Sequence, residues 1–447
     1  MQISSYAANA RMWQLAITNL LSRIGASYAA NARMWQLAIV LAAVYFAEGL
    51  AQQAGLIGQP LRLYLNDTLK LTTTQISLLG WVWYIPVLVK PGLGIITDYM
   101  PIFGSRRKLY LILANAVTTV GYLYMIGAAS WVTVSIAMFI TNGGLIMATA
   151  VTGGLLVENG KQSGLSSRFV SLQWLFFSLA LILASYIAGG LTEHYKDTPL
   201  VALHITAGLS AAAALGMLAV CWYFLDEEKT TAAPDWKLVK QAIKAGVVEV
   251  AQTRAIWIAA LFIFAYFFSP GLGNPLYLYQ MRELHFDQNF IGELGSLGAA
   301  SSIVGGLLFL VMARWMNLRQ LLYFSIVTGT ISGLSMLWLL GETSAIVITV
   351  SGGIIGMVAL ITALSLAAEF CPAGSESFTY AVLMSCHNVC NPLSELTGGL
   401  LYDHVFYDPG LPIFHALIPL IWISSAFTLL PIVIVPFLKF GNKPAKK

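Results

Sequence analysis

Residues 200–224 read LVALHITAGLSAAAALGMLAVCWYF and contain no aspartate, glutamate, lysine or arginine. A membrane-spanning helix needs about 20 mostly apolar residues, whereas a barrel strand needs about 10 residues with strict alternation. The rest of the chain has the same character, because 58% of its 447 residues are hydrophobic and only 10% are charged. Soluble domains carry roughly 25% charged residues. The sequence therefore predicts an all-α polytopic membrane protein.

Eleven further stretches have a similar length and composition, which gives twelve predicted transmembrane helices. The predicted spans are residues 35–58, 74–97, 108–128, 131–157, 168–191, 200–224, 254–271, 289–313, 318–340, 344–369, 377–402 and 411–437.

Lysine and arginine are distributed unevenly between the segments that join these spans. With an N-terminus inside the cell, nineteen of the 24 fall on the inner side and four on the outer side, namely Arg62, Lys70, Lys196 and Arg282. Lys90 lies near the inner end of the second span. Basic residues are retained in cytoplasmic loops, so we predict that both termini are cytoplasmic. The net charge of +4 then reflects topology and gives no indication of nucleic-acid binding.

The longest polar interruption, residues 226–253, divides the chain into six spans and six spans. We therefore expect an N-terminal tail at 1–34, helical bundles at 35–225 and 254–437, a cytoplasmic linker at 226–253 and a basic tail at 438–447. Within the linker, Trp236, Leu238, Val239, Ile243 and Val247 recur at roughly helical spacing. Both an amphipathic helix on the inner membrane surface and a solvated linker remain open.

The segment SYAANARMWQLAI occurs twice, at 5–17 and at 27–39. Thirteen identical residues exceed what helical periodicity produces, so the repeat indicates a recent duplication or a start-site artefact, and the artefact is favoured. No small-residue cleavage site follows a short apolar core, so a signal peptide is not expected.

The cysteines give no sign of a disulfide framework or a metal centre. Cys386 and Cys390 lie one turn apart around His387, but small residues within a spanning helix are better explained by packing. The chain has no phosphate-binding G-x-x-x-x-G-K-[ST] loop and no nucleophile motif. We therefore predict no cofactor, no metal and no enzymatic activity, and an ATP-driven pump is disfavoured.

Three separated segments carry a more specific signal. They are Lys90-Pro91-Gly92-Leu93-Gly94 with Asp98 and Arg106-Arg107-Lys108; Phe262-Ile263-Phe264 with Ser269-Pro270, Leu276-Tyr277 and Leu284-His285-Phe286; and Pro372-Ala373-Gly374-Ser375-Glu376 with Tyr380-Ala381 and Asn388. Their combination and order resemble the folate–biopterin transporter family, a branch of the major facilitator superfamily, over about residues 40–435.

This resemblance implies a twelve-helix carrier with two six-helix bundles that works by alternating access. It implies a folate- or pterin-like substrate, or in some branches a metabolite such as S-adenosylmethionine, commonly with proton coupling. The expected partners are the small-molecule substrate, protons and the lipid bilayer, for a multi-pass monomer in the plasma (inner) membrane.

Charged residues near the predicted inner loops are candidates for gating. The superfamily forms inter-helix ion pairs in the loop between spans 2 and 3, so Asp98 with Arg106, Arg107 and Lys108 is interpreted as a latch; anchoring of the basic trio alone is the alternative. The other candidates flank two later inner loops: Glu158, Arg168, Glu369 and Glu376. The last two acids could pair with Arg314 or Arg319, or all four could be ordinary solvated loop charge.

The first span contains Glu48, followed by Gln52 and Gln53. A charge at mid-bilayer costs about 2.5–3.5 kcal/mol or more, so such residues usually face a cavity or a partner. Burial also favours the protonated form of a carboxyl group, which suits a group that carries a coupled proton. Glu48 is the first candidate for proton coupling or for contact with a substrate cation; a hydrogen-bonded structural glutamate is the alternative.

Other candidates lie in spans 2, 5 and 11. Lys90 could snorkel to the surface or balance an anionic substrate. In span 11, Pro392 frees a backbone carbonyl near His387, Asn388 and Glu395, and broken helices commonly build midplane sites; a helix-to-helix hydrogen bond by His387, or an outer gate at Glu395, is the alternative. A planar pterin would stack on aromatic rings, for which Trp83 and Trp174 beside Gln173 are the candidates.

The leading hypothesis is thus a proton-coupled secondary transporter of folate- or pterin-like metabolites. A carrier for another small organic solute and a non-transporting membrane assembly or sensor protein are the alternatives.

Overall fold

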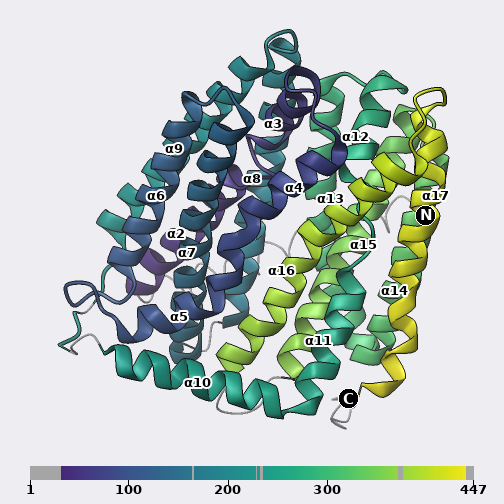
Figure 1. Ribbon diagram of the computed structural model, residues 1–447. Helices are drawn as coiled ribbons and strands as arrows, with labels where there is room; N and C mark the ends of the chain where they lie inside the picture. Colours follow the sequence, from purple (N-terminus) through teal and green to yellow (C-terminus); the bar gives the residue numbers. More distant parts are fainter. Residues whose placement is uncertain (1–31, 164–165, 228, 232–234, 371–375, 439–447) are drawn as a thin grey trace, which may run out of the picture.

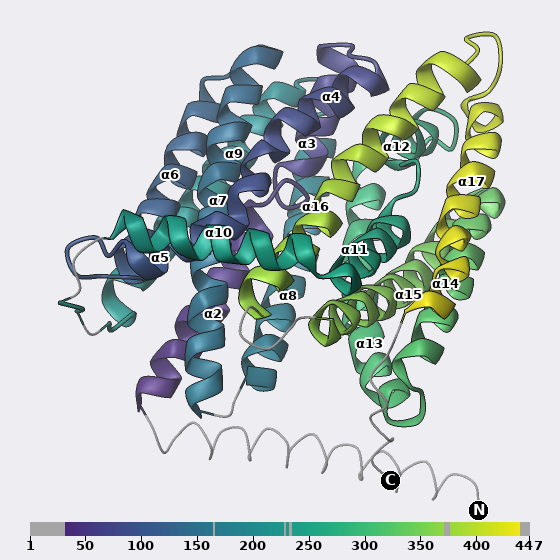
Figure 2. The same ribbon diagram turned by 60° about the horizontal axis from the view of Figure 1, so that its bottom comes forward.

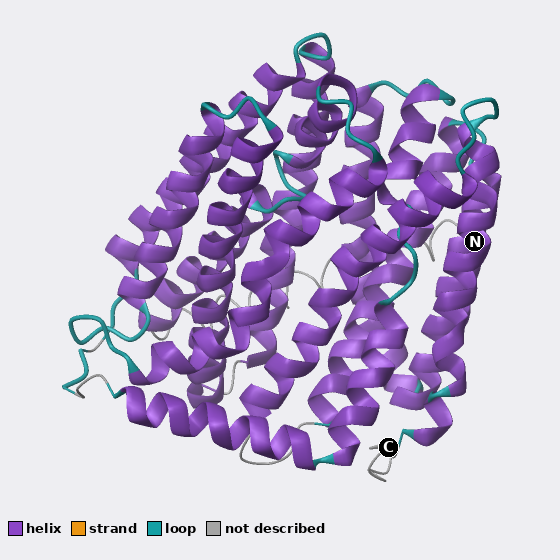
Figure 3. Ribbon diagram, in the orientation of Figure 1, coloured by secondary structure: helices purple, strands orange, loops and turns teal. Residues whose placement is uncertain are grey.

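A computed structural model describes residues 32–163, 166–227, 229–231, 235–370 and 376–438. Within these ranges the chain is almost entirely helical, with loops joining the helices and a single bridge, Ile102 to Ser105, in place of any strand (Figure 3). The repeated segment at 5–17 lies outside the described residues, and the second copy at 27–39 runs into the first described helix. The all-α prediction is confirmed.

The first half of the chain forms one group of helices and the second half another (Figure 1). The first group consists of α2 (Ala32–Ala51), α3 (Gly58–Leu63), η1 (Tyr64–Thr68), α4 (Thr73–Tyr84), η2 (Ile85–Val89), α5 (Lys90–Tyr99), α6 (Lys108–Ile126), α7 (Trp131–Ser163), α8 (Ser166–His194) and α9 (Pro199–Phe224). The linker contains α10 (Trp236–Gln252).

The second group has a similar make-up. It consists of α11 (Arg254–Phe267), α12 (Gly273–Arg282), α13 (Gln288–Trp315), α14 (Leu318–Ser335), η3 (Met336–Trp338), α15 (Glu342–Glu369), α16 (Glu376–Leu401), η4 (Tyr402–Phe406), α17 (Ile413–Leu429), η5 (Leu430–Val433) and η6 (Val435–Phe437).

Eight helical segments in the described residues are long and apolar enough to cross a membrane, and each coincides with a predicted span. They begin at Lys108, Trp131, Phe169, Pro199, Gln288, Leu318, Glu342 and Ile413. The other four predicted spans correspond to α2, α4–α5, α11 and α16, and two short helices, α3 and α12, follow the first and the seventh of the predicted spans. The count of twelve remains a prediction.

These four spans are interrupted or polar for identifiable reasons. Pro86 and Pro91 begin new helical segments within the second span, because proline cannot donate the backbone hydrogen bond of a helix interior. Pro270 separates α11 from α12, and Pro392 lies inside α16. In a membrane protein, broken backbone is tolerated where it lines a cavity or is buried in protein. We therefore expect these spans to surround the transport site.

The linker helix α10 meets α11 at an angle of 83° and lies across one end of both groups of helices (Figures 1 and 2). It packs against α5, α11 and α16. The chain therefore forms a helix here, as the first of the two interpretations of this linker predicted. We call this end of the molecule the α10 end and the opposite end the closed end.

Each half has its own apolar core. Three clusters of buried apolar side chains lie wholly within the first half, around residues such as Ile57, Leu111 and Leu41. The remaining clusters lie wholly within the second half, around residues such as Phe262 and Leu417. Since hydrophobic burial is the main stabilising term in folding, each half is held together more strongly than the two halves are held to each other.

The halves meet where α8 crosses α13 and where α4 crosses α16. Small residues allow the first crossing to be very close: a Cβ atom at Gly292 would lie 2.7 Å from the Gly189 Cα atom and 2.6 Å from the Ser185 carbonyl oxygen. Such small-residue contacts let spanning helices approach closely.

The crossing predicts the effect of adding one methyl group. Gly292→Ala should destabilise the protein by about 1–3 kcal/mol through overpacking, measured as a lower melting temperature in detergent. Gly143→Ala is the matched control, because a Cβ atom there meets nothing within 4 Å. Both changes gain about 1 kcal/mol of helix propensity, so a Gly292 variant as stable as the control would contradict the close crossing.

Candidate functional site

A cavity of about 650 Å³ lies between the two halves. Its lining comes from α2, α3, η1, α4, η2, α5, α7 and α8 of the first half and from α12, α13 and α16 of the second. Both interrupted spans of the first half thus contribute to it from each side of the break, and α16 contributes residues before and after Pro392. The volume falls within the range of about 300–1,000 Å³ that is typical of small-molecule sites.

Seven of the ten predicted substrate or proton residues line this cavity. They are Glu48, Gln52, Gln53, Trp83, Lys90, Asn388 and Glu395. The structure thus places residues from spans 1, 2 and 11, which are distant in sequence, around one space.

The other three candidates do not line it. Trp174 makes an edge contact with Phe177 at 5.7 Å between ring centroids, beside Gln173 on α8. The His387 ring packs against Phe267 with centroids 4.1 Å apart, and its Nδ1 atom lies 3.2 Å from the Asn388 Oδ1 atom. In this conformation His387 is thus a packing residue that orients the Asn388 amide.

Glu48 and Lys90 face the cavity from α2 and from the start of α5. One carboxylate oxygen of Glu48, Oε2, is buried and has no hydrogen-bond partner in the described part of the chain. Lys90 is the cation whose charge acts on Glu48, although the two side chains do not form a direct ion pair in the described structure. A buried oxygen without a partner is costly when it carries charge, so Glu48 is suited to hold a proton or a ligand donor.

Glu395 occupies a different part of the same cavity. Its carboxylate lies beside Gly273, the first residue of α12. A Cβ atom at Gly273 would lie 2.7 Å from the Glu395 Oε2 atom, so a side chain at this position would force the carboxylate to move. Exposed N–H groups and the helix dipole both favour an anion there, and the charge of Arg62 also acts on Glu395.

The sequence did not identify Arg62 as a site residue. Arg62 was assigned to an outer loop, but it belongs to α3, which continues the first span, and it lines the cavity. Its guanidinium carbon lies 5.4 Å from the centroid of the Tyr277 ring, an arrangement typical of a cation–π contact. The sequence could have indicated this position, because Arg62 lies close to the end of an apolar run that contains Glu48.

Several uncharged polar residues of the cavity were also missed. Asn142 of α7 donates a hydrogen bond to the Trp83 carbonyl oxygen at 3.0 Å. Asn391 donates to the Tyr84 hydroxyl group at 3.2 Å and joins α16 to α4. Trp83 itself is only 1% exposed and packs within an apolar cluster of the first half. In this conformation it supports the cavity wall and offers no open stacking face.

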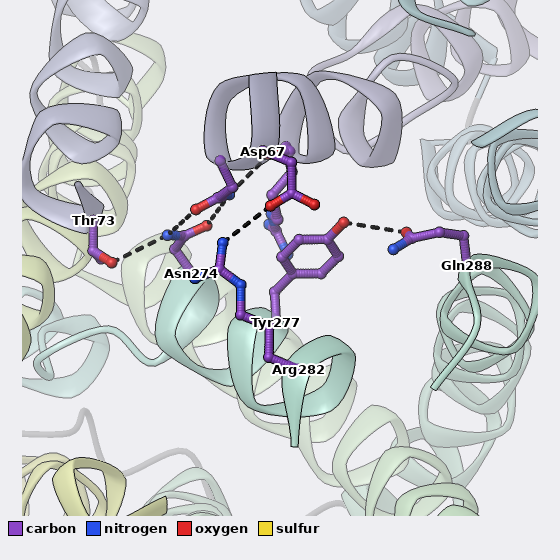
Figure 4. A network of polar contacts seen from close by, with 8 residues as sticks. Asp67, Thr73, Asn274, Tyr277, Arg282 and Gln288 are labelled. Carbon is purple, nitrogen blue, oxygen red and sulfur yellow. Dashed lines mark hydrogen bonds and ion pairs between the residues drawn. The ribbon is translucent and has the colours of Figure 1, made fainter. Parts of the chain in front are cut away.

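Polar contacts join the two halves at the closed end (Figure 4). The amides of Asn66 and Asn274 donate to each other's carbonyl oxygens at 2.9 and 3.1 Å, and Asn274 also donates to the Thr73 hydroxyl oxygen at 3.1 Å. Asn66 and Asn274 are both buried, at 5% and 4% exposure. This three-residue contact closes the space between η1, α4 and α12.

A second group of contacts lies beside it. The Gln59 amide donates to the Gln288 side-chain oxygen at 2.8 Å, and the Tyr277 hydroxyl group donates to the same oxygen at 3.2 Å. The Gln288 backbone N–H donates to the Glu193 carboxylate at 2.9 Å. Gln59, Asn274 and Tyr277 also line the cavity, so the cavity wall and the seal of the closed end share residues.

A surface ion pair completes the network. Arg282 and Asp67 approach to 3.0 Å, with side chains 49% and 39% exposed. Exposed pairs contribute about 0–1 kcal/mol, so the buried amide contacts are the main seal.

At the α10 end, the predicted latch residues meet an acid that the sequence did not single out. The Glu227 carboxylate of the linker accepts hydrogen bonds from the backbone N–H groups of Arg106, Arg107 and Lys108 at 2.8–2.9 Å. It also accepts from the Ser105 hydroxyl group at 2.5 Å. A carboxylate at this position satisfies the free N–H groups at the start of α6.

The side chains of the basic trio point to different places. The Arg107 guanidinium group donates to the Thr97 hydroxyl oxygen at 2.7 Å and is buried, whereas Arg106 is exposed and Lys108 is half-buried. The side chain of Asp98, within α5, lies outside the description. The latch between Asp98 and the trio therefore remains a prediction.

The other gating candidates are placed only in part. Glu369 is exposed at the last residue of α15. The side chains of Glu158, Arg168 and Glu376 lie outside the described part, although their backbones belong to α7, α8 and α16.

The chain is similar to known transporters in sequence. The BT1 family matches residues 48–443. The folate-biopterin transporter of Synechocystis sp. is 26% identical over 428 residues, which cover 91% of this chain and 83% of that protein. Folate transporter 1 of Plasmodium falciparum is 23% identical over 355 residues, which cover 75% of this chain and 67% of that protein.

The fold is similar to solved structures of major facilitator transporters. The nucleoside transporter NupG superposes with a TM-score of 0.68 at 12% identity, covering 90% of this chain and 98% of that one. The D-xylose–proton symporter superposes with a TM-score of 0.69 at 12% identity, covering 90% and 97%. At these identities the likeness shows the fold, which confirms the predicted fold class.

The closed-end network predicts the effect of removing one amide. Asn274→Ala removes the contacts from the second half to Asn66 and Thr73 of the first half. It should favour separation of the halves at this end by about 1–3 kcal/mol. Spin labels at Asp197 and Asp408, both exposed at the closed end, should report a larger population of long distances in a cysteine-free background.

Asn142→Ala is the matched control, since its hydrogen bond to Trp83 stays within the first half. Equal distance distributions in both variants would contradict the assignment of Asn274 to the seal.

Proposed function

The chain belongs to the BT1 family, and from that premise and the residues of its central cavity we propose that it is a proton-coupled secondary transporter of folate- or pterin-like metabolites. The observation that carries the proposal is a single cavity, built by both halves, in which carboxylates and cations face the same space. The relatives named as folate transporters support the substrate class.

Alternating access follows from how the halves are held. Each half keeps its own apolar core, while hydrogen bonds among Asn66, Asn274, Gln59 and Gln288 join them at the closed end. With the α10 end in the cytoplasm, the closed-end contacts would seal the outer side of the cavity. Breaking the closed-end contacts and moving the halves as units would open the cavity outward, as in other carriers built from repeats.

The cavity cations provide contacts for an anionic substrate. Arg62 and Lys90 come from different spans and both face the cavity. Folates carry carboxylates, and an arginine fork binds a carboxylate with two parallel hydrogen bonds. Arg62 lies over Tyr277, beside residues of the closed-end seal. A carboxylate bound there would contact the same groups that hold the halves together.

Proton coupling is assigned to Glu48. Its Oε2 atom is buried without a described partner, and Lys90 is the neighbouring cation. When Glu48 is charged it is balanced by Lys90; when it is protonated, Lys90 is free to attract an anionic substrate. Proton and anion would then bind together, which is the requirement for symport. Localisation in the plasma (inner) membrane and a monomeric state belong to the same proposal.

The decisive experiment measures uptake of labelled folate and biopterin into proteoliposomes with and without an inward proton gradient. Wild-type protein should show gradient-stimulated uptake. Glu48→Gln should lose most of the stimulation while keeping measurable exchange of substrate without a gradient, because glutamine cannot carry the proton. Glu342→Gln is the matched control, since Glu342 is exposed at the start of α15.

Stimulation that persists in Glu48→Gln would move the coupling role to another residue. Absence of binding and uptake of both compounds, in folded wild-type protein, would contradict the substrate class. Uptake of a cationic solute such as S-adenosylmethionine instead would favour the alternative in which Glu48 and Glu395 bind a substrate cation. For a cationic substrate, Arg62→Gln should leave uptake unchanged. For folate, the same change should weaken binding by about 1.5–3 kcal/mol, because it removes the contact between Arg62 and a substrate carboxylate.

A further inference from the structure

The linker helix α10 carries a lysine cluster that the transport mechanism does not use. Lys237, Lys240 and Lys244 are all exposed and are spaced three and four residues apart, so they form one stripe along the helix. Together with Trp236 and Gln241 they line a shallow surface hollow of about 330 Å³. Within the described part of the chain, no acid forms an ion pair with any of the three.

Apolar side chains border this stripe on both sides. Val239 and Gly246 are buried against the rest of the protein. Going around the helix from this buried face, the next positions are Trp236 and Val247, which are 55% and 53% exposed, and the lysine stripe follows. Beyond the lysines, Val248 and Leu238 are 41% and 44% exposed. The order of the faces is therefore protein contact, exposed apolar edge, cations, and a second partly apolar edge.

The helix lies in the orientation that a membrane surface requires. It meets the spanning helix α11 at 83° and crosses the inner ends of both halves (Figure 2). It runs from α5 to α11 (Figure 1), and none of its described side chains lines the cavity between the halves. For a right-handed helix in that direction, the flank with the lysines turns away from the space between the halves.

We propose that this surface of α10, formed by Trp236, Lys237, Lys240, Lys244 and Val247, binds the headgroups of anionic phospholipids in the adjacent leaflet. Interfacial helices place tryptophan and aliphatic residues at the acyl boundary and lysines at the phosphates. The anionic leaflet attracts such basic segments strongly. A soluble acidic partner would use the lysines but would leave the exposed Trp236 and Val247 unexplained.

The linker around α10 is also tied to the first half of the chain. The Glu227 carboxylate binds the start of α6, the Thr230 N–H donates to the Gly104 carbonyl oxygen at 2.8 Å, and the Asp235 N–H donates to the Tyr99 carbonyl oxygen at 3.1 Å. Lipid binding by α10 would therefore fix, at the membrane surface, the covalent connection between the two halves.

The test is hydrogen exchange of residues 236–252 in full-length protein reconstituted into nanodiscs. One set contains phosphatidylcholine alone and the other contains added phosphatidylglycerol. Amide exchange in α10 should slow several-fold in the anionic discs, and high salt should reverse the effect. The combined variant K237Q/K240Q/K244Q should lose this dependence on lipid. K443Q/K446Q/K447Q, with the same change in charge on the C-terminal tail, should keep it.

Equal exchange of α10 in both lipids would overturn the proposal, and so would an unchanged lipid effect in K237Q/K240Q/K244Q. If inorganic phosphate or a soluble RNA protects α10 in phosphatidylcholine discs while phosphatidylglycerol does not, the occupant is a soluble anion and the lipid assignment is wrong. Unchanged exchange in α6 and α9 of each variant verifies that the fold is intact.

Discussion

Polar groups within a bilayer must find partners inside the protein, because the surrounding lipid offers none. The arrangement of this chain follows from that constraint. Most of the eight long apolar segments run as unbroken helices, whereas the spans interrupted near Pro86 and Pro270, and α16 with Pro392 inside it, occur where the two halves face each other. Glu48, Lys90, Arg62 and Glu395 gather in the same place. In the described structure, the cavity thus brings backbone groups near helix breaks and charged side chains together in a space away from the lipid.

Apolar burial also makes each half rigid, whereas the contacts between the two halves are weaker and can change. Every cluster of buried apolar side chains in the described structure lies within one half. The halves meet through glycine contacts at Gly189 and Gly292 and through amide pairs such as Asn66 with Asn274. A typical hydrogen bond contributes only about 0.5–1.5 kcal/mol net, so several of them can hold a seal that a ligand is able to reverse. A two-state carrier needs such contacts, present in one state and absent in the other.

Shared residues connect the cavity to this seal. Tyr277 donates to Gln288 and supports the Arg62 guanidinium group on its ring, and the Glu395 carboxylate lies beside Gly273 at the start of α12. A substrate that engages Arg62 or Glu395 would act directly on α3 and α12, which carry the seal. Substrate binding in the cavity would therefore act on the same helices whose contacts must break before the halves can separate at the closed end. Glu48 and Lys90 line the same cavity. In the proposed symport, protonation of Glu48 leaves the charge of Lys90 available to an anionic substrate.

The sequence by itself determined the fold class and the positions of the eight long apolar spans, because hydropathy and length act locally along the chain. It also identified Glu48, Lys90, Asn388 and Glu395, since a polar residue within an apolar run is conspicuous without any knowledge of its neighbours. The tertiary structure alone decided that Arg62 enters the cavity, that Asn274 and Gln288 seal the closed end, that His387 packs against Phe267 and that Glu227 binds the start of α6. Each of these roles depends on a partner in another helix or in the linker, up to 229 residues away, and contacts over such separations are set by how the helices pack.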